Sequence, residues 1–141
     1  MHRRARPILL LLAIAVGSAA CGDGQTSTAA TLTQPTPTTV TETFTGTLNP
    51  NGATTHGFAV QTAGTVTAAV VTIAPESSTV IGFSLGTLSA NACQISLAND
   101  RATQGTTVVA SAASAGTLCV RVYDVGNVTE TQSYEIRVVH P

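Results

Sequence analysis

Hydrophobic and polar residues alternate in short segments from Thr41 to the end of the chain. Alternation with a period of two is typical of strands that bury one face. Turn-forming residues such as Asn49–Gly52 and Pro75–Ser78 separate these segments. The expected strands, eight in all, are Phe44–Leu48, His56–Val60, Thr65–Ile73, Ile81–Leu85, Cys93–Leu97, Thr106–Ala110, Leu118–Val122 and Tyr134–Val138. This pattern predicts an all-β protein with the strands arranged as an antiparallel β-sandwich.

Two places in this pattern are expected to be connections. Asn99-Asp100 is typical of a turn, and Ala110–Ala115 is expected to be a loop because serines and Gly116 interrupt its apolar run. No window shows a sustained 3.6-residue apolar period, so we predict no helix in this part of the chain.

The composition supports the fold class and excludes one class of partner. Threonine occurs 25 times, and all six basic residues are arginines. Threonine and valine favour strands. Removal of the leader described below leaves three arginines against seven acidic residues. We therefore predict no nucleic-acid partner, because such a partner requires a basic patch.

Residues 1–20 have the three parts of a secretory signal peptide. Arginines at positions 3, 4 and 6 form a positive start, Ile8–Val16 is apolar, and small residues follow at 17–20. The apolar stretch is too short for a membrane-spanning helix, which needs about 20 residues.

The run Ser18-Ala19-Ala20-Cys21 resembles the lipobox of bacterial lipoproteins. This resemblance implies that the leader is cut before Cys21 and that lipid, palmitate among its chains, is attached there. The membrane would then be a partner through the N-terminal lipid, and the protein would lie in the cell envelope, on the outer membrane or the cell surface. The alternative is ordinary cleavage, which leaves Cys21 as a thiol.

Residues 21–40 are rich in threonine, serine and proline, with few large apolar side chains. Such a segment buries too little surface to offset the entropy of ordering. We predict a disordered tether that holds the sandwich domain, residues 41–141, away from the lipid surface.

Several motifs in this domain resemble those of bacterial pre-peptidase C-terminal domains. They are Phe44-Thr45-Gly46-Thr47-Leu48, Phe58-Ala59-Val60 and Gly64-Thr65-Val66 near the start, and Ala115–Asp124 and Tyr134–Val138 near the end. The resemblance covers roughly residues 42–139. It implies a jelly-roll-like sandwich of an extracellular bacterial protein, in a family with some members that bind collagen or polysaccharide. No peptidase domain accompanies it here, so we expect a stand-alone module.

We predict no catalytic residues, no metal site and no cofactor. His56 lies on an alternating segment beside Phe58, and His140 is next to the last residue. Asp124, Asn127 and Glu130 lie in one loop and offer oxygen atoms for Ca²⁺, but their spacing differs from an EF-hand loop. We expect them to bond the backbone of the turn instead. Tyr134 is expected in the core, which leaves Tyr123 as the aromatic residue most suited to a surface role.

The cysteine count predicts one disulfide. If Cys21 carries lipid, Cys93 and Cys119 remain to pair in an oxidising compartment. Cys93 alternates with Ile95 and Leu97, an apolar and therefore core-like face, whereas Cys119 lies opposite Val120. We therefore expect the bridge at the edge of the sandwich. The alternative is two separate buried thiols.

Three functions fit these observations. The first is a binding or adhesion module that captures an extracellular polymer or a protein. The second is a structural envelope lipoprotein without a ligand. The third, a hydrolase with an unrecognised site, is disfavoured because no catalytic set is apparent.

Overall fold

The computed structural model describes residues 38–141, and within them the chain forms strands and no helix. The strands are β1 (Val40–Leu48), β2 (Ala53–Val60), β3 (Gly64–Ala74), β4 (Ile81–Ser89), β5 (Ala92–Ala102), β6 (Thr107–Ala112), β7 (Gly116–Tyr123) and β8 (Gln132–His140). The predicted signal peptide, Cys21 and most of the predicted tether lie outside the described residues. Within residues 38–141, no helix has the length and apolar character that crossing a membrane requires.

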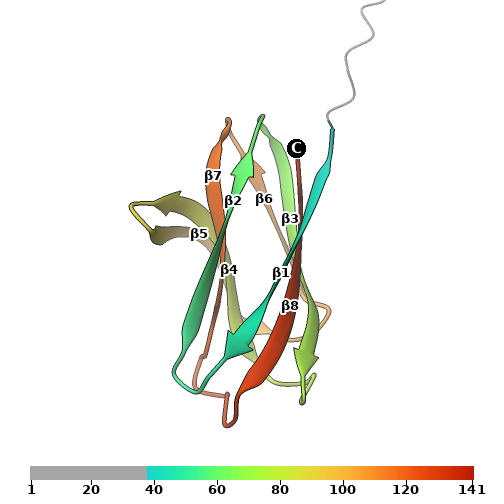
Figure 1. Ribbon diagram of the computed structural model, residues 1–141, viewed down its shortest axis with the longest axis vertical. Helices are drawn as coiled ribbons and strands as arrows, with labels where there is room; N and C mark the ends of the chain where they lie inside the picture. The colour runs from blue at the N-terminus through green and yellow to red at the C-terminus, as the bar shows by residue number, and fades with distance from the viewer. Residues whose placement is uncertain (1–37) are drawn as a thin grey trace, which may run out of the picture. The chain divides into compact units, whose positions relative to one another are not determined.

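The strands form two four-stranded antiparallel sheets that pack face to face (Figure 1). The first sheet has the order β1-β8-β3-β6, and the second has the order β2-β7-β4-β5. The first strand pairs with the last, and each later strand pairs with the one before the previous partner, as in one long hairpin. The four pairs are β1·β8, β2·β7, β3·β6 and β4·β5. A long hairpin rolled into two sheets is the jelly-roll topology, so the predicted all-β, jelly-roll-like sandwich is confirmed.

The core lies between the sheets and follows the predicted alternation. Every second residue of the central strands is buried there, as Phe83 and Leu85 show on β4 and Val120 and Val122 on β7. Val66, Val70, Ile136 and Val138 face them from the first sheet. Burial of each such side chain stabilises the fold by roughly 1.5–3 kcal/mol.

Strand β5 departs from the sequence prediction in two ways. Asn99 and Asp100 lie within the strand, so the predicted turn there is wrong; the chain turns instead at Thr103–Thr106. Ile95 and Leu97 are 44% and 38% exposed, so neither belongs to the core as their alternation predicted.

The physical reason is a pair of register shifts between β4 and β5, at Ile81/Phe83 and at Leu85/Gly86. Each shift places one extra residue on β5, and an extra residue bends a strand and increases its twist. The second shift falls between Leu97, which pairs with Leu85, and Ile95, which pairs with Gly86, so these two residues no longer share one face of the strand. The bend also carries this part of β5 away from the other sheet. The predicted loop at 110–115 also begins later than expected, because β6 continues to Ala112.

Candidate binding face on the outer side of the second sheet

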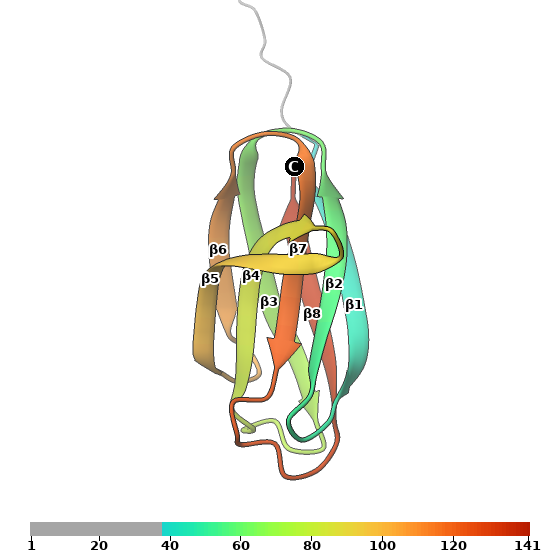
Figure 2. The same ribbon diagram turned by 90° about the vertical axis from the view of Figure 1, so that its left-hand side faces the viewer.

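The end of the β4–β5 hairpin folds over the outer face of the second sheet, the face directed away from the core. Figure 2 shows this end, residues Thr87–Gln94, crossing in front of β7 towards β2. We call it the hairpin arm. The arm reaches β2, because a Cβ atom on Gly57 would come within 2.7 Å of Leu88 Cδ2. It therefore covers part of this face.

Two positions allow the arm to take this path. A Cβ atom at Gly86 would overlap the main-chain oxygen of Gln94 and lie 2.7 Å from its carbonyl carbon, so only glycine fits under the returning strand. At the tip, Ala90 and Asn91 have φ values of 48° and 64° between the paired residues Ser89 and Ala92. Two successive positive φ values are typical of a type I′ turn, which joins strands in a tight hairpin.

A disulfide between Cys93 of the arm and Cys119 of β7 fixes the arm in place, with a Cα–Cα distance of 5.8 Å. The predicted pairing is confirmed, but its predicted location at the sandwich edge is wrong. Cys119 belongs to an interior strand, and it is fully buried because the arm covers it. In a flat sheet, β5 and β7 would lie about 10 Å apart with β4 between them, too far for a disulfide. The bend in the hairpin removes this gap.

Tyr123 also crosses β4 on this face. A Cβ atom on Gly82 would overlap its ring, so the ring lies directly on the β4 backbone. The hydroxyl of Tyr123 donates a hydrogen bond to Asp100 of β5. Burial, together with the nearby Asp100 carboxylate, raises the pKa of Tyr123 to about 12. The phenol is therefore a neutral hydrogen-bond donor at physiological pH.

Arg121 lies above this tyrosine, with its Cζ atom 5.6 Å from the centroid of the Tyr123 ring, a cation–π distance. Arg121 also lines a shallow hollow of about 290 Å³ between the arm tip and β2. The other lining residues are Ala53, Thr55, Asn91, Ala92 and Cys93. Among residues 38–141, Arg121 forms no ion pair with a carboxylate. The hollow thus contains a guanidinium, a hydroxyl and an amide, and none of its lining residues is acidic.

The two histidines of the described residues lie elsewhere, along the side of the sandwich where β1 and β8 meet β2. His56 Nε2 is 2.8 Å from the Tyr134 hydroxyl, and the His56 ring stacks on Phe44 at 5.0 Å. Burial lowers the pKa of His56, which favours the neutral ring. Tyr134 is buried, as predicted.

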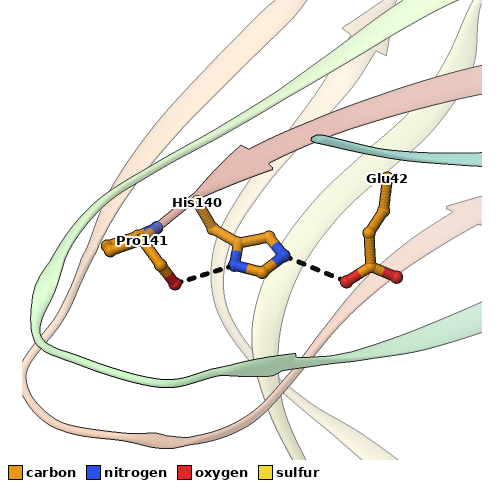
Figure 3. A network of polar contacts seen from close by, with 3 residues as sticks. All are labelled: Glu42, His140 and Pro141. Atoms are coloured by element: carbon orange, nitrogen blue, oxygen red, sulfur yellow. Dashed lines mark hydrogen bonds and ion pairs between the residues drawn. The ribbon is translucent and has the colours of Figure 1, made fainter. Parts of the chain in front are cut away.

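Figure 3 shows His140 between two oxygen atoms. Its Nε2 is 3.0 Å from a Glu42 carboxylate oxygen, and its Nδ1 is 3.1 Å from the main-chain oxygen of Pro141. The ring is buried and lies 5.2 Å from that of Phe58. Because both ring nitrogens have partners, neither is available as a base for a nucleophile.

The sequence analysis missed one pattern, the Gly-x-Ser-x-Gly of Gly82–Gly86, which is typical of the nucleophile in α/β-hydrolases. In those enzymes the serine lies at a strand-to-helix turn. Here Ser84 lies inside β4, is fully buried, and its hydroxyl has no hydrogen-bond partner within residues 38–141. The small residues at 82, 84 and 86 instead leave room for what packs on this face. Their alternation was a signal that a second layer covers β4.

The loop considered for Ca²⁺ is organised around Asp124. One carboxylate oxygen accepts hydrogen bonds from the backbone amides of Gly126, Asn127 and Val128, and the other accepts one from Asn51. These bonds lower the pKa of Asp124. Across residues 38–141, no three His, Cys, Asp or Glu side chains are grouped in a way that suits a metal ion. The interpretation that side chains of this loop bond its backbone is confirmed for Asp124, and it stays a prediction for Asn127 and Glu130.

The outer face of the first sheet is different. Its β1 positions are the exposed threonines 41, 43, 45 and 47. No disulfide of the described residues and no folded-back hairpin lies on it. Of the two outer faces, that of the second sheet is therefore the one that carries a folded-back hairpin and a disulfide.

No protein-family model matches the chain, and no curated protein matches it either. The resemblances to bacterial lipoproteins and to pre-peptidase C-terminal domains accordingly stay predictions.

Proposed function

We propose that this protein is an exported bacterial lipoprotein whose sandwich domain is a non-catalytic binding module. The lipid on Cys21 would anchor it to the envelope membrane, and the outer face of the second sheet would capture an extracellular polymer or protein. The observation that carries this proposal is the hairpin arm, fixed by the Cys93–Cys119 disulfide over a face that also presents Arg121 and Tyr123.

The physical argument is preorganisation. An arm that is held before binding loses little further conformational entropy when a partner arrives, so more of the interaction energy is available for affinity. Strand β1, which follows the predicted tether, belongs to the first sheet. The proposed binding face therefore belongs to the other sheet, which does not contain β1.

The side chains support a non-catalytic role. Ser84 is buried in mid-strand, His140 is held by two oxygen atoms, and His56 contacts a tyrosine hydroxyl. A nucleophile needs a base within hydrogen-bond reach and access to a substrate. Tyr134 and His56 form such a pair, but Tyr134 is buried, so a substrate does not reach its hydroxyl.

The second candidate is a structural envelope lipoprotein without a ligand. The threonine-lined outer face of the first sheet favours it, because small hydroxyl side chains form an even, hydrated surface. The two candidates make different predictions: a binding module uses the outer face of one sheet to bind its ligand, whereas a structural protein needs no ligand on either outer face.

Two experiments test the proposal. For the anchor, cells expressing the full chain are fed an alkyne-bearing fatty acid, and the Cys21→Ser variant is the control. We expect label and detergent partitioning in the parent protein and neither in the variant. Equal behaviour of the two proteins would rule out lipidation at Cys21.

For binding, the full chain is presented to immobilised envelope and matrix polymers. Thr55→Glu places a charge on the outer face of the second sheet, and Thr45→Glu places a matched charge on the first. We expect Thr55→Glu to abolish binding and Thr45→Glu to preserve it. The reverse result would reject the outer face of the second sheet as the binding face, and no binding to any polymer would favour the structural alternative.

A further inference from the structure

We infer that the hollow beneath the tip of the hairpin arm is a binding site for a carboxylate group, with Arg121 as its principal ligand. This inference deepens the proposed function and rests on it for its biological meaning. It assigns the chemistry of the group that the outer face of the second sheet would recognise.

The hollow has the donors that an anion requires. Arg121 supplies a guanidinium, Thr55 a hydroxyl and Asn91 a side-chain amide, from β7, β2 and the arm tip. Thr55 and Arg121 are direct cross-strand partners in the β2·β7 pairing, so the sheet itself fixes their separation. With no acidic residue in the lining, nothing in the hollow repels an incoming anion.

Among residues 38–141, no carboxylate neutralises the positive charge of Arg121. Asp100, the acid nearest to Tyr123 on this face, accepts the hydrogen bond of the tyrosine hydroxyl, whereas Arg121 lies over the ring of that tyrosine. The cation–π contact favours this position of the guanidinium and leaves its N–H groups free to donate. A planar guanidinium matches a carboxylate through two parallel hydrogen bonds, which a lysine reproduces less well, and its single positive charge balances the one negative charge of a carboxylate but not the two of sulfate.

The size of the hollow limits what enters it. A volume of about 290 Å³ is at the lower end for ligand pockets, so it suits one acidic group rather than an extended segment. The disulfide matters here because Cys93 is itself a lining residue. Holding Cys93 against β7 keeps the Asn91 side of the hollow at a fixed height above Arg121.

The test is an NMR titration of the full chain carrying Cys21→Ser, with sodium acetate as the probe and sodium chloride at equal ionic strength as the reference. We expect saturable shifts at the Arg121 side chain, the Thr55 amide and the Asn91 side-chain amide with acetate alone. Sodium sulfate should bind at least several-fold more weakly. A galacturonate trisaccharide and a short peptide with a free carboxyl terminus then distinguish sugar from peptide carboxylates.

Variants separate the site from general charge effects. Arg121→Gln should abolish the saturable response, and Arg121→Lys should weaken it several-fold because the paired hydrogen bonds are lost. Asn91→Gly removes the amide yet suits the positive φ of 64°, so it should weaken binding without unfolding the arm. Arg137→Gln, an exposed arginine on the first sheet, is the matched control and should leave binding unchanged.

The outcomes are distinguishable from failure of the proposed function. Absence of saturation with acetate, equal affinity for sulfate, or an unchanged response in Arg121→Gln would overturn the carboxylate site. Polymer binding by the full chain that survives Arg121→Gln would keep the binding function and reject this site. Acetate binding without any polymer partner would keep the site and reject the proposed function.

Discussion

Replacing Gly86 by alanine should displace the hairpin arm, and the structure gives the size of the effect. The new Cβ atom would overlap the main-chain oxygen of Gln94, lie 2.7 Å from its carbonyl carbon and lie 2.9 Å from Ile95 Cα. All three atoms belong to the backbone, so no side-chain rotation relieves the overlap. To regain ordinary van der Waals separation, the β5 backbone must retreat by about 1 Å.

We expect Gly86→Ala to lower the free energy of unfolding by about 3 kcal/mol. Overpacking at buried sites costs about 1–3 kcal/mol, and a backbone obstacle places this case at the upper end. Two glycines serve as controls. At Gly57 the nearest atom is the far end of the Leu88 side chain, so alanine should cost under about 1 kcal/mol. At Gly116 no atom lies within 4 Å, so alanine should stabilise the fold by about 0.5 kcal/mol.

Thermal and urea denaturation followed by far-UV circular dichroism measure these differences. In a domain of this size, about 3 kcal/mol lowers the Tm by roughly 12–24 °C. Equal midpoints for Gly86→Ala and Gly116→Ala would refute the reasoning, because the arm would then not lie on β4.

A double-mutant cycle tests the cause. The ring closed by the disulfide spans a sequence separation of 26 residues, so replacing both cysteines by serine should itself cost about 3.5 kcal/mol in the chain-entropy model. Without the disulfide the arm can lift away from β4, so Gly86→Ala should cost at least about 1 kcal/mol less in that background. An unchanged penalty would show that the disulfide does not hold the arm against Gly86.

Other substitutions probe separate features by the same denaturation assay. Ser84→Ala removes a buried hydroxyl without a partner within residues 38–141 and should stabilise the fold by about 1 kcal/mol; a loss would mean that the hydroxyl is bonded. Ala90→Gly suits the φ of 48° and should gain up to about 1 kcal/mol, whereas a loss would argue against the type I′ turn. Asp124 has a lowered pKa, so the stabilisation that it provides is complete above pH 3.8 and disappears as the pH falls through the pKa of the folded state. Asp124→Asn should lower the free energy of unfolding by about 1 kcal/mol at pH 7 and remove this dependence on acid. The pKa of His56 is lowered by burial, so the unfolded chain takes up the proton first and stability falls as the pH drops below 6.5; His56→Gln should flatten the profile there.

The sequence by itself determined the strands and most of the core. Strict alternation places Phe83 and Leu85 on one side of β4 and Val120 and Val122 on one side of β7, and a one-residue slip would expose all four. The three cysteines also predicted the pairing of Cys93 with Cys119, but only on the expectation that lipid occupies Cys21 and that the protein is exported.

The tertiary structure alone decided where β5 goes. Ile95 and Leu97 have the alternation of core residues, yet they are exposed because two register shifts bend their strand out of the sandwich. A shift depends on how two strands pair, and a one-strand pattern contains no information about the partner. The same limit explains why Asn99 and Asp100, good turn residues, lie inside a strand.

The candidate site could not be predicted from the sequence for a related reason. Arg121 and Tyr123 are ordinary outward positions of one strand, and Thr55 and Asn91 are distant from them in sequence. Only the paired strands β2 and β7 and the arm that folds back over them bring these residues to one hollow. The alternation of Gly82, Ser84 and Gly86 indicated that something packs on β4, but not which part of the chain. Small residues in a strand indicate that another part of the chain packs against it. Which part packs there depends on contacts between residues far apart in the sequence.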